Sequence, residues 1–429
     1  MARHADLLAR HRRVLPQWLS LYYGEPIELV RGNGRRVVDA EGREYLDLFG
    51  GILTTMTAHA LPEVVEAVQR QAERILHTST VYLIESQVEL AEEIARLAPM
   101  DDAKVFFTTS GSEANEFALL LACTERRSHQ VLALRNSYHG RSFATMAITG
   151  NRGWSASALS PVDVKYVHGG YRYRSPYRLL DDNAYIEACV EDLRDVIATQ
   201  TAGDVACFIA EPIQGLGGFA TPPDGLFGAM KEVLDAHGIL YITDEVQTGW
   251  GRTGEHFWGV QAHAVTPDAL TFAKGIGNGL TLAGVVARGD LMDGITANSI
   301  STFGGNPLSC AGALANLRYL IQHDLQGNAL RIGGYMMRAL CERSAAWPAV
   351  GEIRGKGLMM GIELVRPETR EPDPGAAGRV LEAAKTRGVL IGKGGLHNNV
   401  LRIAPPMTLT REEADEGLAA LEAALSEHN

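Results

Sequence analysis

The sequence has few cysteines and no arrangement of them that suggests a disulfide framework or a metal site. Its five cysteines lie far apart, and no two of them form a Cys-x-x-Cys pair. Cys207 lies in the apolar run VACFIA and is expected to be a small buried hydrophobic side chain. The histidines His59, His139 and His168 also lack the spacing of metal ligands. The sequence therefore predicts no zinc site and no disulfide-stabilised fold.

The chain also lacks an excess of positive charge and a long apolar run. Its formal net charge is −11, so we expect no sequence-independent binding to nucleic acid, and an anionic substrate would need locally placed arginines. No run reaches the length of a membrane helix. The start, MARHADLLARHRRVLPQW, is basic and somewhat amphipathic, which leaves organelle targeting open, but it lacks the apolar core of a secretory signal. We expect a cytoplasmic protein.

What the sequence has is a regular alternation of apolar strands with helices. The runs KVFFTT, QVLAL, VACFIA and ILYIT are separated by helical stretches such as EANEFALLLACTER and LFGAMKEVLDAHG. Continuous apolar strands alternating with helices predict an α/β fold with a mostly parallel sheet covered on both faces. Later, EIRGKGLMMGIELV indicates a strand pair, and the last helix begins with a capping box at Thr410 and Glu413.

Polar residues follow three of these apolar strands directly. Asp244 follows ILYIT, Glu211 follows VACFIA, and Ser110-Gly111-Ser112 follows KVFFTT at the start of a helix. Taken singly, each of these is explained more simply as a helix cap or a loop ion pair. Because the carboxyl ends of parallel strands meet at one edge of a sheet, the three together predict a ligand site there.

A lysine completes this set. Lys274 stands in TFAKGIGNGL between an apolar run and three glycines, and lysine is seldom buried without a partner or a function. Pyridoxal 5′-phosphate needs an anion cradle, an acid that keeps its pyridine nitrogen protonated, and a lysine that holds its aldehyde as a Schiff base. Ser-Gly-Ser at a helix start, Asp244 and Lys274 supply these three groups. The reacting lysine must be neutral, so a partly desolvated site suits it.

The sequence resembles the class III pyridoxal-phosphate aminotransferases over nearly its whole length. The resemblance rests on the motifs TTSGSEANEFALLLA, NSYHGRSFATMAITG, AEPIQGLGG, TDEVQTGWGRTG, TFAKGIGNG, STFGGNPLSCA, IRGKGLMMGIEL and LRIAPPMTL. Within the class, ILHTSTVY and GKGGLHNNVLRIAPPMTLT are most similar to the alanine–glyoxylate aminotransferase branch. The resemblance implies a fold type I enzyme with an N-terminal segment (1–60), a large cofactor domain (61–310) and a C-terminal part (311–429). The two ends are expected to build one smaller α+β domain.

The resemblance also implies roles for individual residues. Lys274 and Asp244 are the expected catalytic residues. Tyr138 is expected to stack on the pyridine ring, Val246 to pack against it, and Gln247 to approach its phenolic oxygen. Thr302 is expected to reach the phosphate in a neighbouring subunit, which implies a homodimer with shared sites, or a tetramer. The other expected cofactor contacts are Ser110, Gly111, Ser112, His139 and Glu211.

Substrate recognition is expected to depend on arginines. Arg402 lies in the apolar run VLRIA, where a charge needs a partner. The resemblance makes it the anchor of the substrate α-carboxylate, and the alternative is a structural ion pair. In relatives Glu211 often pairs with this arginine when no carboxylate is bound. Arg141 matches relatives that accept a distal carboxylate, or it forms a loop or interface ion pair. Ala58 stands where the class usually has glycine, and it is expected to reshape the loop near Ile52 at the border of the substrate pocket.

The implied reaction is a ping-pong transfer of an amino group. An amino acid or ω-amino acid gives its amine to the cofactor, and a 2-oxo acid, with pyruvate or glyoxylate favoured and 2-oxoglutarate as a third candidate, collects it. Two other kinds of function stay open. The first is a different reaction on the same fold, by a lyase of the phospholyase type, a decarboxylase or an aminomutase. The second is a pyridoxal-binding protein without turnover.

Overall fold

The centre of the protein is a sheet in which all strands but one point the same way. The computed structural model describes residues 2–156 and 159–427, and in this part of the chain seven strands form the central sheet in the order β4-β10-β9-β8-β7-β5-β6. β10 pairs antiparallel with β4 and β9, and the other pairs are parallel. The predicted mostly parallel sheet is therefore confirmed. The strands are β4 (Ala103–Thr108), β5 (Gln130–Leu134), β6 (Asp163–Val167), β7 (Cys207–Ala210), β8 (Leu240–Asp244), β9 (Ala269–Phe272) and β10 (Ala283–Arg288).

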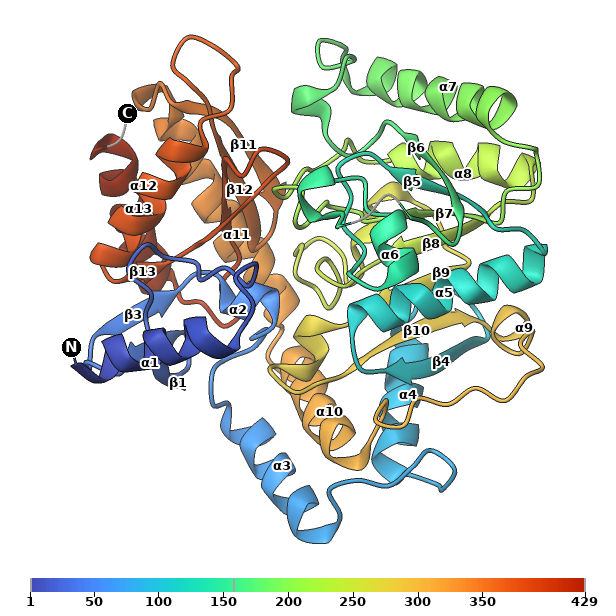
Figure 1. The fold of residues 1–429 in the computed structure, drawn as a ribbon, viewed down its shortest axis with the longest axis horizontal. Helices are drawn as coiled ribbons and strands as arrows, with labels where there is room; N and C mark the ends of the chain where they lie inside the picture. Colours follow the sequence, from blue (N-terminus) through green and yellow to red (C-terminus); the bar gives the residue numbers. More distant parts are fainter. Residues whose placement is uncertain (1, 157–158, 428–429) are drawn as a thin grey trace.

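Helices cover both faces of this sheet, which explains why its strands are continuous apolar runs. In β5, Val131 and Ala133 belong to one hydrophobic cluster, whereas Leu132 and Leu134 belong to another. This alternation arises because successive strand residues point to opposite faces. One face is covered by α5 (Gly111–Arg126) and the other by α7 (Asp182–Gln200) and α8 (Leu226–Ala236) (Figure 1).

The two ends of the chain come together beside the central sheet. β3 pairs in parallel with β13, so a strand near the N-terminus is continued by one near the C-terminus. Figure 1 shows both termini on this side of the molecule. The pairing supports the predicted three-part division of the chain, which stays a prediction. The two sheets here are β1 (Leu29–Asn33), β2 (Arg36–Asp39), β3 (Glu44–Asp47) and β13 (Val389–Leu390), and β11 (Val350–Lys356), β12 (Met359–Leu364), β15 (Val400–Ile403) and β14 (Gly392–Gly394).

The remaining helices pack around these sheets or form short connections. α10 packs against α3 and α4 below the central sheet, and α11, α12 and α13 cover the smaller sheets (Figure 1). No helix among the described residues is long and apolar enough to cross a membrane. The helices not yet bounded are α1 (Ala2–Val14), α2 (Gly50–Leu53), α3 (Pro62–Arg74), α4 (Glu85–Leu97), α6 (Phe143–Ala147), α9 (Gly289–Met292), α10 (Pro307–Gln322), α11 (Leu325–Arg343), α12 (Pro374–Thr386) and α13 (Arg411–Glu427). Short 3₁₀ turns are η1 (Arg152–Trp154), η2 (Arg172–Arg174), η3 (Gly259–His263), η4 (Lys274–Gly277) and η5 (Ser344–Ala346).

Candidate active site

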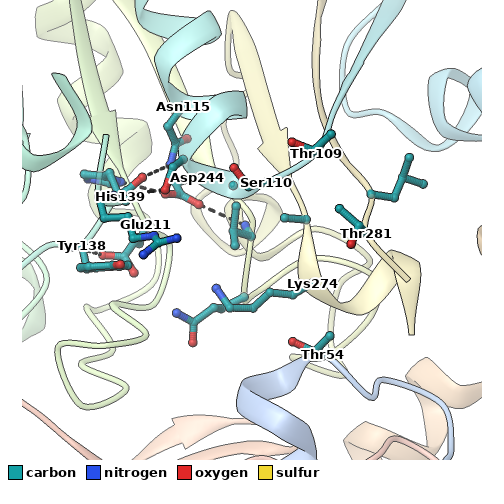
Figure 2. A pocket seen from close by; sticks show the side chains of 18 of the residues that line it. Thr54, Thr109, Ser110, Asn115, Tyr138, His139, Glu211, Asp244, Lys274 and Thr281 are labelled. Carbon is teal, nitrogen blue, oxygen red and sulfur yellow. Dashed lines mark hydrogen bonds and ion pairs between the residues drawn. The ribbon is translucent and has the colours of Figure 1, made fainter. Parts of the chain in front are cut away.

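A cavity of about 370 Å³ lies at the carboxyl ends of β4, β7 and β8. This is the edge of the sheet where the sequence predicts a site, and its volume lies in the range of small-molecule pockets. Figure 2 shows Lys274 and Thr54 on one side of the cavity and Asp244 with Asn115 and His139 on the other. Most of the predicted site residues line it: Ser110, Gly111, Ser112, Tyr138, His139, Arg141, Glu211, Asp244, Val246, Gln247 and Lys274.

Asp244 is held by three donors from different parts of the chain. Its Oδ2 accepts hydrogen bonds from Asn115 Nδ2 at 2.7 Å and from His139 Nδ1 at 2.8 Å, and its Oδ1 accepts from the Val246 amide at 3.1 Å. The carboxylate is only 4% exposed. Donors from three segments fix the orientation of this carboxylate. The arrangement is suited to holding a proton on a ring nitrogen placed against Asp244.

Lys274 begins η4 in the left-handed backbone region, with a φ of 46°. Burial lowers the pKa of Lys274, Asp244 and Glu211 raise it, and the positive charge of Arg402 lowers it. Burial is the largest of these effects, so the neutral amine is favoured more than in an ordinary lysine. A neutral amine is the form that attacks an aldehyde.

The start of α5 forms the third wall of the cavity. Ser110 caps the helix by accepting the Glu113 amide at 3.2 Å. The Glu113 carboxylate, however, accepts from the Thr109 amide at 2.7 Å, so the reciprocal bond that a capping box would make to Ser110 is made one residue earlier. The N–H groups of the first turn lack helical acceptors, which makes this end of the helix suitable for a phosphate.

Two features of the cavity fit bound pyridoxal phosphate: buried polar atoms without partners and open space at the start of α5. Gln247 Oε1 and His139 Nε2 are buried without a hydrogen-bond partner among the described residues, and both side chains line the cavity. Buried polar atoms of this kind usually have partners, so they indicate a group that occupies the space. Gly111 leaves room at the helix start, where a Cβ would lie 3.2 Å from the Val246 side chain.

Arg402 lies beside the cavity rather than in its wall. It is buried between two aromatic rings, with its guanidinium carbon 4.9 Å from the Phe49 centroid and 5.5 Å from the Phe219 centroid. Its Nη1 donates to the Gly215 carbonyl at 3.2 Å, and its Nε has no hydrogen-bond partner among the described residues. Burial lowers the pKa of this guanidinium. A buried cation with a free donor is suited to capturing a carboxylate.

The direct pair between Glu211 and Arg402 that the resemblance suggests is replaced by backbone contacts. The Glu211 carboxylate accepts from the Tyr138 and Gly215 amides, both at 2.9 Å. The Gly215 amide belongs to the loop of Glu211 itself and the Tyr138 amide to the loop after β5, whereas Arg402 bonds to the Gly215 carbonyl. Burial raises the pKa of Glu211 to about 7.

Ile52 and Thr302 also lie outside the cavity wall. Ile52 belongs to a left-handed turn, α2, in which Gly50, Gly51, Ile52 and Leu53 have φ angles of 54°, 57°, 67° and 61°. Asp47 Oδ1 holds this turn by accepting the Phe49 and Gly50 amides at 2.9 Å. The turn places Thr54 in the cavity wall and leaves Ile52 45% exposed. Thr302 lies in an exposed loop, so its predicted contact requires another subunit.

Sequence reasoning missed two residues behind Asp244. Asn115 donates to both Asp244 and the His139 carbonyl, and Thr271 donates to Asn115 Oδ1 at 2.7 Å. The signal available in the sequence was an asparagine on the apolar face of a helix, beside Ala114 and Ala118. A buried amide there requires partners, and the partners are the site.

Comparisons with known proteins place this geometry in a family. The family model described as aminotransferase class-III matches residues 22–425. A protein of Arabidopsis thaliana named alanine–glyoxylate aminotransferase 2 homolog 2, mitochondrial, is 37% identical over 98% of this chain and 87% of its own length. An (S)-enantioselective omega-transaminase of Thermomicrobium roseum has a TM-score of 0.91 at 33% identity, over 99% of this chain and 98% of that one. A phospholyase from Arthrobacter in complex with phosphoethanolamine has a TM-score of 0.90 at 34% identity, over 98% and 99%.

Proposed function

This chain belongs to the class-III aminotransferases, and from that premise we propose that it moves an amino group from an α- or ω-amino acid to pyruvate or glyoxylate. The enzymes of this class depend on pyridoxal phosphate, and this chain is such an enzyme. The observation that carries the proposal is the convergence of Lys274, Asp244 and the start of α5 on one cavity. It places a lysine, an acid and an anion cradle around a single space.

The residues of the chain divide the proposed chemistry among them. Lys274 Nζ, favoured as the neutral amine, would hold the cofactor, and once released it would carry the proton from the amine-bearing carbon of the substrate to the cofactor. When bound, pyridoxal phosphate stabilises the negative charge that develops on that carbon. Asp244, held by Asn115 and His139, keeps a proton on the ring nitrogen. The first turn of α5 holds the phosphate.

Two arginines support a substrate with at least one carboxylate. Arg402 is buried with an unpartnered Nε beside the cavity, which suits an α-carboxylate. Arg141 lines the cavity, is exposed, and has no ion-pair partner among the described residues. This supports the substrate interpretation of Arg141 over a loop ion pair within the chain, and a second carboxylate or another anionic group of an ω-amino acid is the chemistry it suits.

A homodimer is supported by exposed apolar side chains around the loop that carries Thr302. Ile300 and Phe303 are each 60% exposed, and Leu83, from the loop between α3 and α4, is 98% exposed. Large apolar side chains gathered on a surface commonly mark an interface. A second copy of the chain would cover them and bring Thr302 to the neighbouring cavity. The cytoplasmic location predicted from the sequence stays a prediction, and the Arabidopsis relative carries the word mitochondrial in its name.

A titration by visible absorbance tests the proposed function. The holoenzyme is mixed with L-alanine, β-alanine, 3-aminoisobutyrate, 4-aminobutyrate, ornithine or phosphoethanolamine without an oxo acid. A donor should convert the bound pyridoxal form to the pyridoxamine form, and pyruvate or glyoxylate should reverse the change. Spectral recovery without an acceptor, with release of ammonia, would instead support a lyase. The similarity to the Arthrobacter phospholyase keeps that function open and makes phosphoethanolamine the first donor to examine. A protein that takes up no pyridoxal phosphate would contradict both.

A further inference from the structure

Arg252 is a buried arginine that the proposed chemistry does not use. It lies in the glycine-rich loop after β8 and is 2% exposed. Its Nη1 donates to the Leu358 carbonyl at 3.3 Å and to the Pro405 carbonyl, and its own carbonyl accepts from the Leu358 amide at 3.2 Å. Its Nη2 has no hydrogen-bond partner among the described residues. The side chain therefore contacts two segments that lie more than 100 positions away in the sequence.

No carboxylate accompanies this guanidinium among the ion pairs of the described residues, and burial lowers its pKa to about 9. Arg354 shows the contrast, since it is also buried but contacts the carboxylates of Glu352 and Glu363. A buried charge without an opposite charge is costly. Retention of an arginine at residue 252 therefore calls for a function that its two carbonyl contacts supply, because an apolar side chain would avoid the cost.

The two carbonyls lie next to the strand that carries Arg402. Pro405 is three residues beyond Arg402, and Leu358 precedes β12, in which Gly361 is the register partner of Arg402. On the other side, Arg252 belongs to the loop that follows Asp244 and contains Gln247. Gly357 fixes the approach, because its φ is 53° and a Cβ there would lie 2.5 Å from the Arg252 carbonyl oxygen. One side chain thus joins the cofactor-facing loop to the strand of the substrate arginine.

We propose that Arg252 is a positioning residue that fixes Arg402 relative to Asp244 and Lys274. This inference rests on the proposed function, in which Arg402 binds the substrate carboxylate. The guanidinium donates to both carbonyls at once from Nη1, which an apolar side chain cannot do. Loss of this link lets the Arg402 strand shift against the cavity, and displacements of about 1 Å are enough to weaken a positioned contact by one to two orders of magnitude.

The test compares substrates with and without a carboxylate in Arg252→Met and Arg252→Lys. We expect the KM for pyruvate and the Kd for propionate, a carboxylate that cannot react, to rise about tenfold or more. The half-reaction with 2-aminobutane, an amine without a carboxylate, should stay within about twofold of wild type, because it does not use Arg402. Arg387→Met is the control, since Arg387 also donates to a backbone carbonyl, that of Ala383 at 2.9 Å, but it caps the end of α12 and pairs with Glu427.

A double-mutant cycle separates positioning from a general structural effect. If Arg252 acts through Arg402, adding Arg252→Met to Arg402→Ala should not raise the Kd for propionate further. Equal losses with both kinds of substrate, an unchanged Kd for propionate, or additive effects in the cycle would overturn the inference. Should Arg252→Met not fold, Arg252→Lys, which keeps the charge on a shorter side chain without the planar guanidinium, should show the same direction. A wild-type enzyme that binds propionate but never transaminates pyruvate would contradict the proposed function and leave the cycle valid.

Discussion

Glu211 and Arg402 bind the two sides of one residue, Gly215. The Gly215 amide donates to Glu211 at 2.9 Å, and its carbonyl accepts from Arg402 at 3.2 Å. A Cβ at residue 215 would displace the end of the Gln247 side chain, which lines the cavity. If Arg402 binds the substrate as proposed, the incoming carboxylate replaces the neutral Gly215 carbonyl as its acceptor. Glu211 keeps its hydrogen bonds to the Tyr138 and Gly215 amides. The contact that the carboxylate displaces is weaker than a charge pair.

Replacement of Lys274 by alanine should reduce turnover below detection. The amine that holds the cofactor and moves the proton is then missing, whereas Asp244 and the start of α5 still bind the cofactor weakly. Steady-state rates and visible spectra check this. Lys165→Ala, which breaks an ion pair with Asp163 on β6, should behave as wild type. Normal turnover in Lys274→Ala would refute the assignment.

Replacement of Asn115 by leucine should weaken both stability and cofactor binding. It removes the donor to Asp244 and leaves the Thr271 hydroxyl and the His139 carbonyl without this partner. We expect a loss of about 1–3 kcal/mol in the free energy of unfolding of the cofactor-free protein, and a higher Kd for pyridoxal phosphate. Thr271→Val, which keeps both Asn115 donors, should have the smaller effect on the Kd. Equal Kd values for Asn115→Leu and wild type would remove Asn115 from the site.

Replacement of Ile52 by glycine should stabilise the protein relative to Ile52→Ala by about 1 kcal/mol. A β-branched residue at a φ of 67° is strained, alanine keeps most of the strain, and glycine removes it at the expense of chain entropy. Chemical denaturation of the two variants measures the difference. Because Ile52 is largely exposed, little burial is lost in either variant. An alanine variant as stable as the glycine variant would show that the turn stores no strain.

Glu245 should make the stability of the protein fall as pH rises. Its carboxylate is buried and accepts from the Thr248 hydroxyl and the Gly259 and Val260 amides, and burial raises its pKa to about 7. Between the ordinary glutamate pKa and this value, the folded state binds a proton that the unfolded state does not. The contribution of Glu245 to the free energy of unfolding therefore falls by about 3 kcal/mol over that interval.

Glu245→Gln cannot ionise, so the wild type should lose more stability than this variant between about pH 5 and pH 8. Chemical denaturation at the two pH values measures the loss. Glu66→Gln, at an exposed position of α3 that pairs with Arg70, should parallel the wild type. Parallel curves for Glu245→Gln and wild type would mean that Glu245 is ionised throughout.

The sequence was sufficient for features that depend on neighbouring residues. The apolar runs at β5, β7 and β8 identify strands because a strand buried on both faces is apolar nearly throughout. The capping box at Thr410 and Glu413 is confirmed, with both bonds present at 3.0 and 3.2 Å. Polar residues directly after these strands then identified the edge of the sheet that carries the site.

Contacts between distant segments were decided only by the tertiary structure. Asn115 and Asp244 are 129 positions apart, and neither residue reveals the other, because a local pattern encodes periodicity and not its distant partners. The same holds for Gly215 between Glu211 and Arg402, and for Arg252 against Pro405. The sequence by itself determined which side chains could do the chemistry. Packing decided which of them meet, since only the folded core brings the carboxyl ends of the strands and the C-terminal sheet to one place. The core also excludes water, which would otherwise compete for the hydrogen bonds of these side chains.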